Sequence, residues 1–107
     1  MIAGLMFALV LTDPGASPPR AELCLAHVNA MIAESQRETG MVAGPSWFVR
    51  SWWTARLPED GTAEALTEEQ RQALDASMPA RKVADPDSYR AELRSCVGEA
   101  IEGGALP

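Results

Sequence analysis

The most reactive side chains of this 107-residue chain belong to its two cysteines and its single histidine. Cys24 and His27 lie three positions apart, a spacing that would place an imidazole beside a thiol on one helix face and could activate a thiolate nucleophile. A bond between Cys24 and Cys96 would leave no nucleophile, and His27 would then be an ordinary residue at the surface or at the edge of the core. So few ligands predict no metal site and no cofactor.

Two pairs of nearby carboxylates, Glu68 with Glu69 and Asp85 with Asp87, could in principle act as general acids and bases. Both pairs lie at predicted helix starts, where a carboxylate caps free N–H groups and suits the positive end of the helix dipole. The sequence holds no CxxC, HExxH, GxSxG, phosphate-loop or calcium-loop motif. We therefore predict no catalytic residues and a protein that is not an enzyme.

The segment WFVRSWW, residues 47–53, has an unusual density of aromatic side chains. Tryptophans beside arginines are typical of the central residues of protein interfaces. The same rings could instead fill the core of a small domain that has few other large apolar residues. On a helical wheel Trp47 turns away from the other rings, so the possible binding face consists of Trp47, Arg50 and Trp53.

An uninterrupted apolar run, Ile2 to Leu11, lies near the start of the chain and precedes a turn. Its length fits the apolar part of a secretory signal peptide and is too short to span a bilayer of about 30 Å as a helix. We expect residues 1–16 to be a signal peptide and residues 17–107 to form a single domain. No Lys or Arg precedes the run, so an ordinary first helix and an uncleaved anchor remain alternatives.

Helical periodicity and capping residues predict an all-α domain, a small up-down bundle of three to four helices without strands. Gly40 would stop the first helix, and Thr67 with Gln70 would form a capping box at the third, which Pro79 would soon end. The third helix carries only Leu74 and Met78 as large apolar residues, so we expect it to be the least stable element. The predicted helices cover residues 18–38, 44–57, 67–79 and 85–103.

The two cysteines are placed to join the first and last helices. Cys24 lies six residues after Pro18, and Cys96 lies six residues before Glu102. Six helical residues rise about 9 Å, so neighbouring antiparallel helices would hold the two thiols at the same height. A Cys24–Cys96 disulfide is thus expected, and it would persist in the periplasm or outside the cell rather than in a reducing cytosol. Two buried free thiols and a redox role are the alternatives.

Charge restricts the possible partners. The net charge is −6 and becomes −5 if residues 1–16 are removed, and the sequence contains no run of basic residues. Both features argue against nucleic acids and anionic membrane surfaces as ligands. An apolar content of 47% is normal for a folded protein.

The chain resembles a group of short, uncharacterised exported proteins of Gram-negative bacteria with two cysteines and a helical body. The resemblance rests on the apolar leader and on three segments: Leu23–Ala26, Trp52–Leu57 and Ser95–Val97. The size, the two-cysteine helical plan and the expected export are also similar to those of the acid-activated periplasmic chaperone HdeA. No activity is known for this group of exported proteins, so the resemblance implies none.

These observations predict a small periplasmic or secreted helical protein that binds another macromolecule, such as an unknown protein partner, and catalyses nothing. It would act as an envelope accessory protein or as a stress-related chaperone. One alternative is a small-ligand carrier or enzyme with an aromatic pocket lined by Trp52, Trp53 and Tyr89. Another is a cytosolic interaction module with free thiols.

Overall fold

The computed structural model describes residues 18–107, and these residues contain helices and loops but no strand. The helices are α2 (Arg20–Thr39), α3 (Gly44–Thr54), α4 (Glu68–Ala84) and α5 (Pro86–Glu102). The predicted all-α class is confirmed. The predicted signal peptide, residues 1–16, lies outside the described residues.

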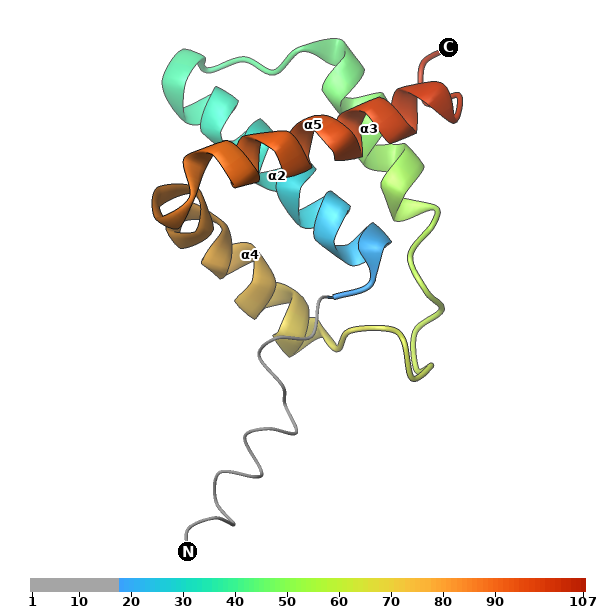
Figure 1. The fold of residues 1–107 in the computed structure, drawn as a ribbon. Coiled ribbons are helices and arrows are strands. Elements are labelled where there is room, and N and C mark those ends of the chain that lie inside the picture. Colours follow the sequence, from blue (N-terminus) through green and yellow to red (C-terminus); the bar gives the residue numbers. More distant parts are fainter. Residues whose placement is uncertain (1–17) are drawn as a thin grey trace, which may run out of the picture.

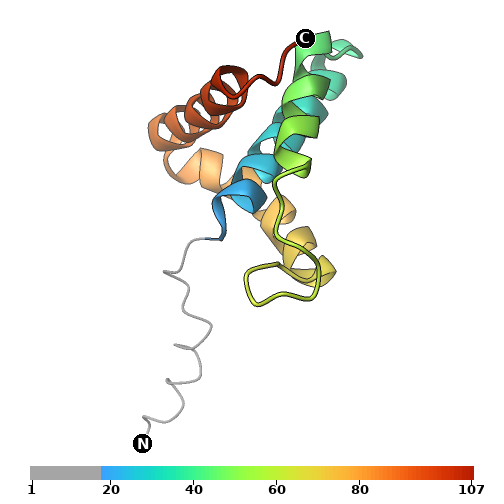
Figure 2. The ribbon, with the colours of Figure 1, turned by 90° about the vertical axis from the view of Figure 1, so that its right-hand side faces the viewer.

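Helix α2 is the centre of the fold (Figures 1 and 2). It packs against α3, α4 and α5, whereas α3 and α4 make no contact with each other in the described part of the chain. Cys24 near the start of α2 is bonded to Cys96 near the end of α5, and His27 lies opposite Glu92, one turn earlier in α5. The two helices therefore run in opposite directions, as predicted.

Helix α4 runs along α2 in the same direction. An ion pair joins Glu22 to Arg71 near the starts of the two helices, and a second joins Glu34 to Lys82 farther along both. Residues 40–43 connect α2 to α3, and the single residue Asp85 separates α4 from α5. Figure 1 shows α5 leaving α4 at a wide angle and crossing α2.

The helix ends are formed by the residues that the sequence indicates. Gly40 ends α2 in the left-handed conformation, with φ of 75°. Thr67 and Gln70 form the predicted capping box, each side chain accepting a hydrogen bond from the backbone N–H of the other. Asp85 accepts a hydrogen bond from the N–H of Ser88 and begins α5. The Thr67 hydroxyl and the Asp85 carboxylate therefore cap helices, as expected, whereas Glu68, Glu69 and Asp87 lie in the first turns without capping an N–H group of the described helices.

The predicted end of the third helix at Pro79 is wrong, because α4 continues to Ala84. Proline removes the hydrogen bond to the carbonyl four residues earlier, here that of Asp75. Both residues are exposed, so water can reach that carbonyl. Met78 is fully buried just before the proline, and the Lys82–Glu34 pair fixes the following turn on α2.

Smaller differences occur at two other helix ends. Helix α2 begins at Arg20 rather than at Pro18, and α3 ends at Thr54 rather than at Leu57. After α3 the backbone tightens, because the N–H of Arg56 donates to the carbonyl of Trp53, three residues earlier. This tighter last turn is common at helix ends and accounts for the shorter α3.

Two apolar clusters lie on opposite sides of α2. The first surrounds the disulfide and contains Ala21, Cys24, Val28, Ile32, Val49, Trp53, Cys96 and Ala100. The second lies beneath α4 and contains Leu23, Ala26, Leu74 and Met78, with Tyr89 packed at its edge. Leu74 and Met78 are the only buried residues of α4, as expected from its sparse apolar stripe.

Close packing of α3 on the end of α5 leads to a prediction for Gly103. The indole N–H of Trp52 donates to the carbonyl of Gly103, and a Cβ added there would overlap Cζ2 of Trp52 and lie 2.8 Å from Cε2. Arg56 stacks on Trp52 with its guanidinium carbon 3.5 Å from the ring centroid, which limits the movement of the indole. We expect Gly103→Ala to lower the free energy of unfolding by about 1–3 kcal/mol in urea denaturation.

Gly98, inside α5 and five residues before Gly103, is the control. An added Cβ at Gly98 has no atom within 4 Å, so Gly98→Ala should leave stability unchanged or raise it by up to about 1 kcal/mol. Equal effects of the two substitutions would contradict the close contact of Trp52 with Gly103.

Candidate functional site

The candidate binding face lies on the side of α3 that points away from the core. Positions 47, 50, 51 and 54 recur at intervals of three and four residues, which places their side chains on one side of the helix. They line an open hollow of about 410 Å³. We define the α3 outer face as the residues lining it: Trp47, Arg50, Ser51, Thr54 and Ala55.

Trp47 and Arg50 are the two side chains of this face with the strongest potential for binding. Trp47 is 42% exposed, and the guanidinium carbon of Arg50 lies 5.7 Å from the centroid of its ring. This geometry fits a cation–π contact, which holds an arginine over an indole while leaving its N–H groups free. Within residues 18–107, Arg50 has no carboxylate at ion-pair distance.

Two further apolar side chains near the start of α3 are exposed. Phe48, next to Trp47 in the chain, is 45% exposed, and Met41 in the preceding loop is 70% exposed. Helix α3 therefore packs on α2 and α5 through part of its apolar side chains and leaves the rest open to solvent.

Trp53, the third residue of the predicted binding face, lies in the core. It is 3% exposed, and its indole N–H donates to the carbonyl of Cys96 at 3.0 Å. Trp52 packs edge-on against it, with the two ring centroids 4.8 Å apart. The structure therefore brings Trp47 and Arg50 together and separates Trp53 from them.

The Cys24–Cys96 disulfide is present, with the two Cα atoms 5.3 Å apart and both residues fully buried. It closes a loop of 72 residues and joins α2 to α5 beside Trp53. Because both cysteines of the chain are bonded, no thiol is available for His27 to activate.

His27 is fully buried, which corrects the prediction of a surface or boundary position. Its Nε2 lies 2.6 Å from Oε1 of Glu92, and its ring contacts Tyr89 with centroids 4.6 Å apart. Nδ1 has no hydrogen-bond partner among residues 18–107. The hydrogen bond to the Glu92 carboxylate of α5 offsets the free-energy cost of burying the imidazole. Helical periodicity does not predict this contact, because the two residues are far apart in the sequence.

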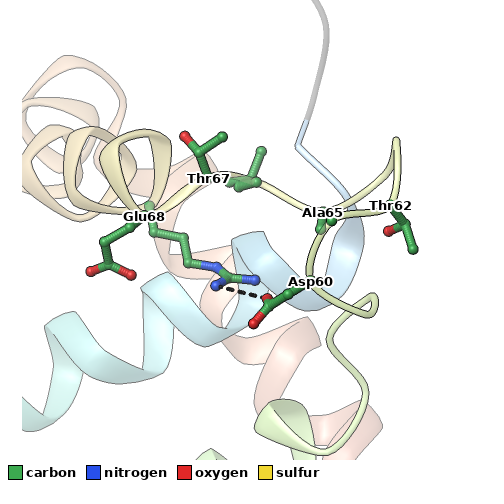
Figure 3. A pocket seen from close by; sticks show the side chains of 8 residues that line it. Asp60, Thr62, Ala65, Thr67 and Glu68 are labelled. Carbon is green, nitrogen blue, oxygen red and sulfur yellow. Dashed lines mark ion pairs between the residues drawn. The ribbon is translucent and has the colours of Figure 1, made fainter.

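A buried ion pair at the starts of α2 and α4 is a charged cluster that helical periodicity does not predict. Glu22 is 3% exposed and accepts hydrogen bonds from Nε and Nη2 of Arg71 and from the N–H of Leu66. The hydrogen bonds from Arg71 hold the pKa of Glu22 below its usual range. Asp60 lies 3.6 Å from the same guanidinium (Figure 3).

The ion pair borders a second open hollow of about 410 Å³, lined by the loop before α4 (Figure 3). The guanidinium of Arg71 faces this hollow, but Glu22 and Asp60 already balance its charge. The arrangement therefore fixes the loop and α4 on α2 rather than offering a site for an anion. A lone glutamate within an apolar stretch, as at Glu22, is a sequence signal that could have pointed to such a pair.

The residues proposed for an aromatic pocket do not come together. Trp52 and Trp53 pack in the cluster around the disulfide, whereas Tyr89 lies at the edge of the cluster beneath α4. Within residues 18–107 no three His, Cys, Asp or Glu side chains gather closely enough to bind a metal ion. No helix in the same range combines the length and the apolar character that crossing a membrane requires.

Comparisons of the chain with protein-family models, with curated proteins and with solved structures gave no match.

Proposed function

We propose that this protein is exported and acts by binding another protein through the α3 outer face, without catalysing a reaction. The proposal rests on the exposure of Trp47. Two of the three tryptophans pack into the fold, while Trp47 remains 42% exposed beside Arg50, which forms no ion pair in the described part of the chain. Tryptophan and arginine together dominate the binding energy of many protein interfaces.

The buried disulfide supports the proposed export. A bond between two fully buried cysteines contributes to stability only where thiols are kept oxidised, as in the periplasm or outside the cell. The apolar run from Ile2 to Leu11 fits a signal peptide for export to the same compartments.

Site-specific photo-crosslinking tests the proposed binding face. A photoreactive phenylalanine analogue replaces Trp47 in the cells that produce the protein, and illumination should yield a discrete adduct with one protein. Val83 on α4 is the matched control, because it is 82% exposed and lies on an element that does not contact α3. Equal labelling at both positions, or no adduct at position 47, would argue against this binding face.

A second candidate function is that of an acid-activated chaperone. It is favoured by the buried carboxylate that holds α4 on α2. Glu22 is buried and ionised, and α4 covers the apolar side chains of Leu23 and Ala26 on α2. Protonation of Glu22 would break the ion pair with Arg71 and loosen α4, while the disulfide would keep α2 and α5 together. Apolar surface suited to unfolded proteins would then become exposed.

The sign of the expected pH effect follows from the lowered pKa of Glu22. The ion pair contributes its full stability above about pH 4.5 and loses it as the pH falls through the lower folded pKa. Asp75 opposes this trend, because partial desolvation of its carboxylate raises its pKa and its protonation relieves repulsion from Glu68 and Glu22. Circular dichroism and binding of an apolar dye should show loosening between pH 7 and pH 3, and an unchanged fold would exclude this candidate.

A further inference from the structure

We propose that the α3 outer face binds an acidic segment of its partner protein, with a carboxylate on Arg50 and an apolar side chain against Trp47. This inference rests on the proposed function and adds the chemistry of the partner. The carboxylate and apolar groups must be close together in the partner, because Arg50 already lies over the ring of Trp47.

Charge distribution is the first observation that points to an acidic ligand. Residues 39–58, which include all of α3, contain Arg50 and Arg56 and no Asp or Glu. Because the net charge of the chain is −6, the remaining residues carry −8. Arg56 stacks on Trp52 and does not line the α3 outer face, so Arg50 is the charged residue of that face. Its attraction to an acidic segment would also speed association.

The second observation is the unused hydrogen-bonding capacity of Arg50. Arg20, Arg71, Lys82 and Arg90 each have a carboxylate within 4.0 Å in the described structure, and Arg56 donates to the carbonyl of Trp52. Within residues 18–107, Arg37, Arg50 and Arg94 do neither, and of these three only Arg50 lies over an exposed tryptophan ring. Its planar guanidinium can bind a carboxylate through two parallel N–H groups.

The surroundings of Arg50 favour a partner with few negative charges over a polyanion. An extended nucleic acid or an anionic membrane would meet the acidic remainder of the protein as well as α3, and repulsion would oppose binding. A short acidic segment can lie within the hollow between Trp47 and Thr54, which has a volume of about 410 Å³. Apolar residues in that segment would cover the exposed rings of Trp47 and Phe48.

Two matched synthetic peptides test the proposal on the full disulfide-bonded protein labelled with ¹⁵N. One alternates Glu with Leu and Phe, and the other has Gln in place of each Glu. We expect the acidic peptide to shift the Trp47 indole resonance and the α3 amides, and to bind at least about tenfold more tightly than the Gln peptide at low salt. The difference should shrink toward about 0.15 M salt, because screening weakens exposed charge contacts.

Variants separate the specific site from a general effect of charge. Arg50→Gln should remove most of the preference for the acidic peptide, whereas Arg94→Gln, at another exposed arginine without an ion-pair partner, should preserve it. Circular dichroism spectra of both variants should match that of the parent protein, since neither side chain is buried.

The other possible results would change the proposal in different ways. Equal binding of both peptides at α3 would overturn the acidic ligand and keep the proposed protein-binding function. Shifts confined to other helices would overturn both. Binding of anionic lipid vesicles in place of the acidic peptide, or concentration-dependent dimers in sedimentation that Trp47→Ser abolishes, would replace the acidic partner with a membrane or with a second copy of the chain.

Discussion

Replacing both cysteines, Cys24→Ala with Cys96→Ala, is expected to lower the free energy of unfolding by about 4 kcal/mol. The disulfide closes a loop of 72 residues, and the chain-entropy model assigns about this value to the lost restriction of the unfolded chain. A domain of this size has a total stability on the order of 5–10 kcal/mol, so the variant should unfold at a much lower urea concentration.

Reductant provides the control for this experiment. Dithiothreitol should destabilise the parent protein to about the level of the double variant and leave the variant unchanged. A difference below about 1 kcal/mol between parent and variant would contradict a stabilising role for the disulfide.

Arg71→Met is expected to lower the free energy of unfolding at pH 7 by about 3–5 kcal/mol. The substitution removes the cation that pairs with Glu22 and leaves a carboxylate that is 3% exposed without its charge partner. Arg90→Met is the matched control, because the pair of Arg90 with Asp87 is exposed and 3.5 Å long, and its loss should cost at most about 1 kcal/mol.

The pH dependence of this variant should be reversed in sign. In the parent protein the pKa of Glu22 is lowered, so stability falls with acid as the carboxylate is protonated. In the variant the buried carboxylate has no cation, so its pKa should rise and stability should increase from pH 7 to pH 5. Adding Glu22→Gln to Arg71→Met should restore part of the loss at pH 7. An Arg71→Met curve parallel to that of the parent would contradict the ion pair.

Local signals in the sequence predict most of the fold. Thr67 with Gln70, Asp85, and Gly40 act within one helical turn, so their types and spacing are sufficient to place helix ends. The Cys24–Cys96 pairing was predicted from equal distances to the predicted helix ends, and it is present although α2 begins at Arg20 rather than at Pro18. Pro79 shows the limit of such signals, because contacts of α4 with α2 outweigh the local cost of proline in a helix.

The features that sequence reasoning missed depend on contacts between distant parts of the chain. His27 meets Glu92 at a separation of 65 residues, and Glu22 meets Arg71 at a separation of 49. A polar residue on an apolar helix face is predicted to be exposed as long as its partner on another helix is unknown. These two contacts therefore required the three-dimensional structure.

The candidate site was predictable in part. The helical wheel separates Trp47 from the other rings and places Arg50 near it, and the structure shows this pair together and exposed. The position of Trp53 depends on which side of α3 packs against α5, and its hydrogen bond to the carbonyl of Cys96 holds it in the core.

The central claim, an exported protein held together by a disulfide, is tested most directly by intact mass. The protein is expressed with its own N-terminus and recovered without reductant from the periplasm and from the cytosol. We expect a periplasmic species that lacks the apolar leader and is lighter by two hydrogen atoms than its reduced form. A full-length chain with two free thiols in the cytosol would contradict the proposed export and the disulfide together.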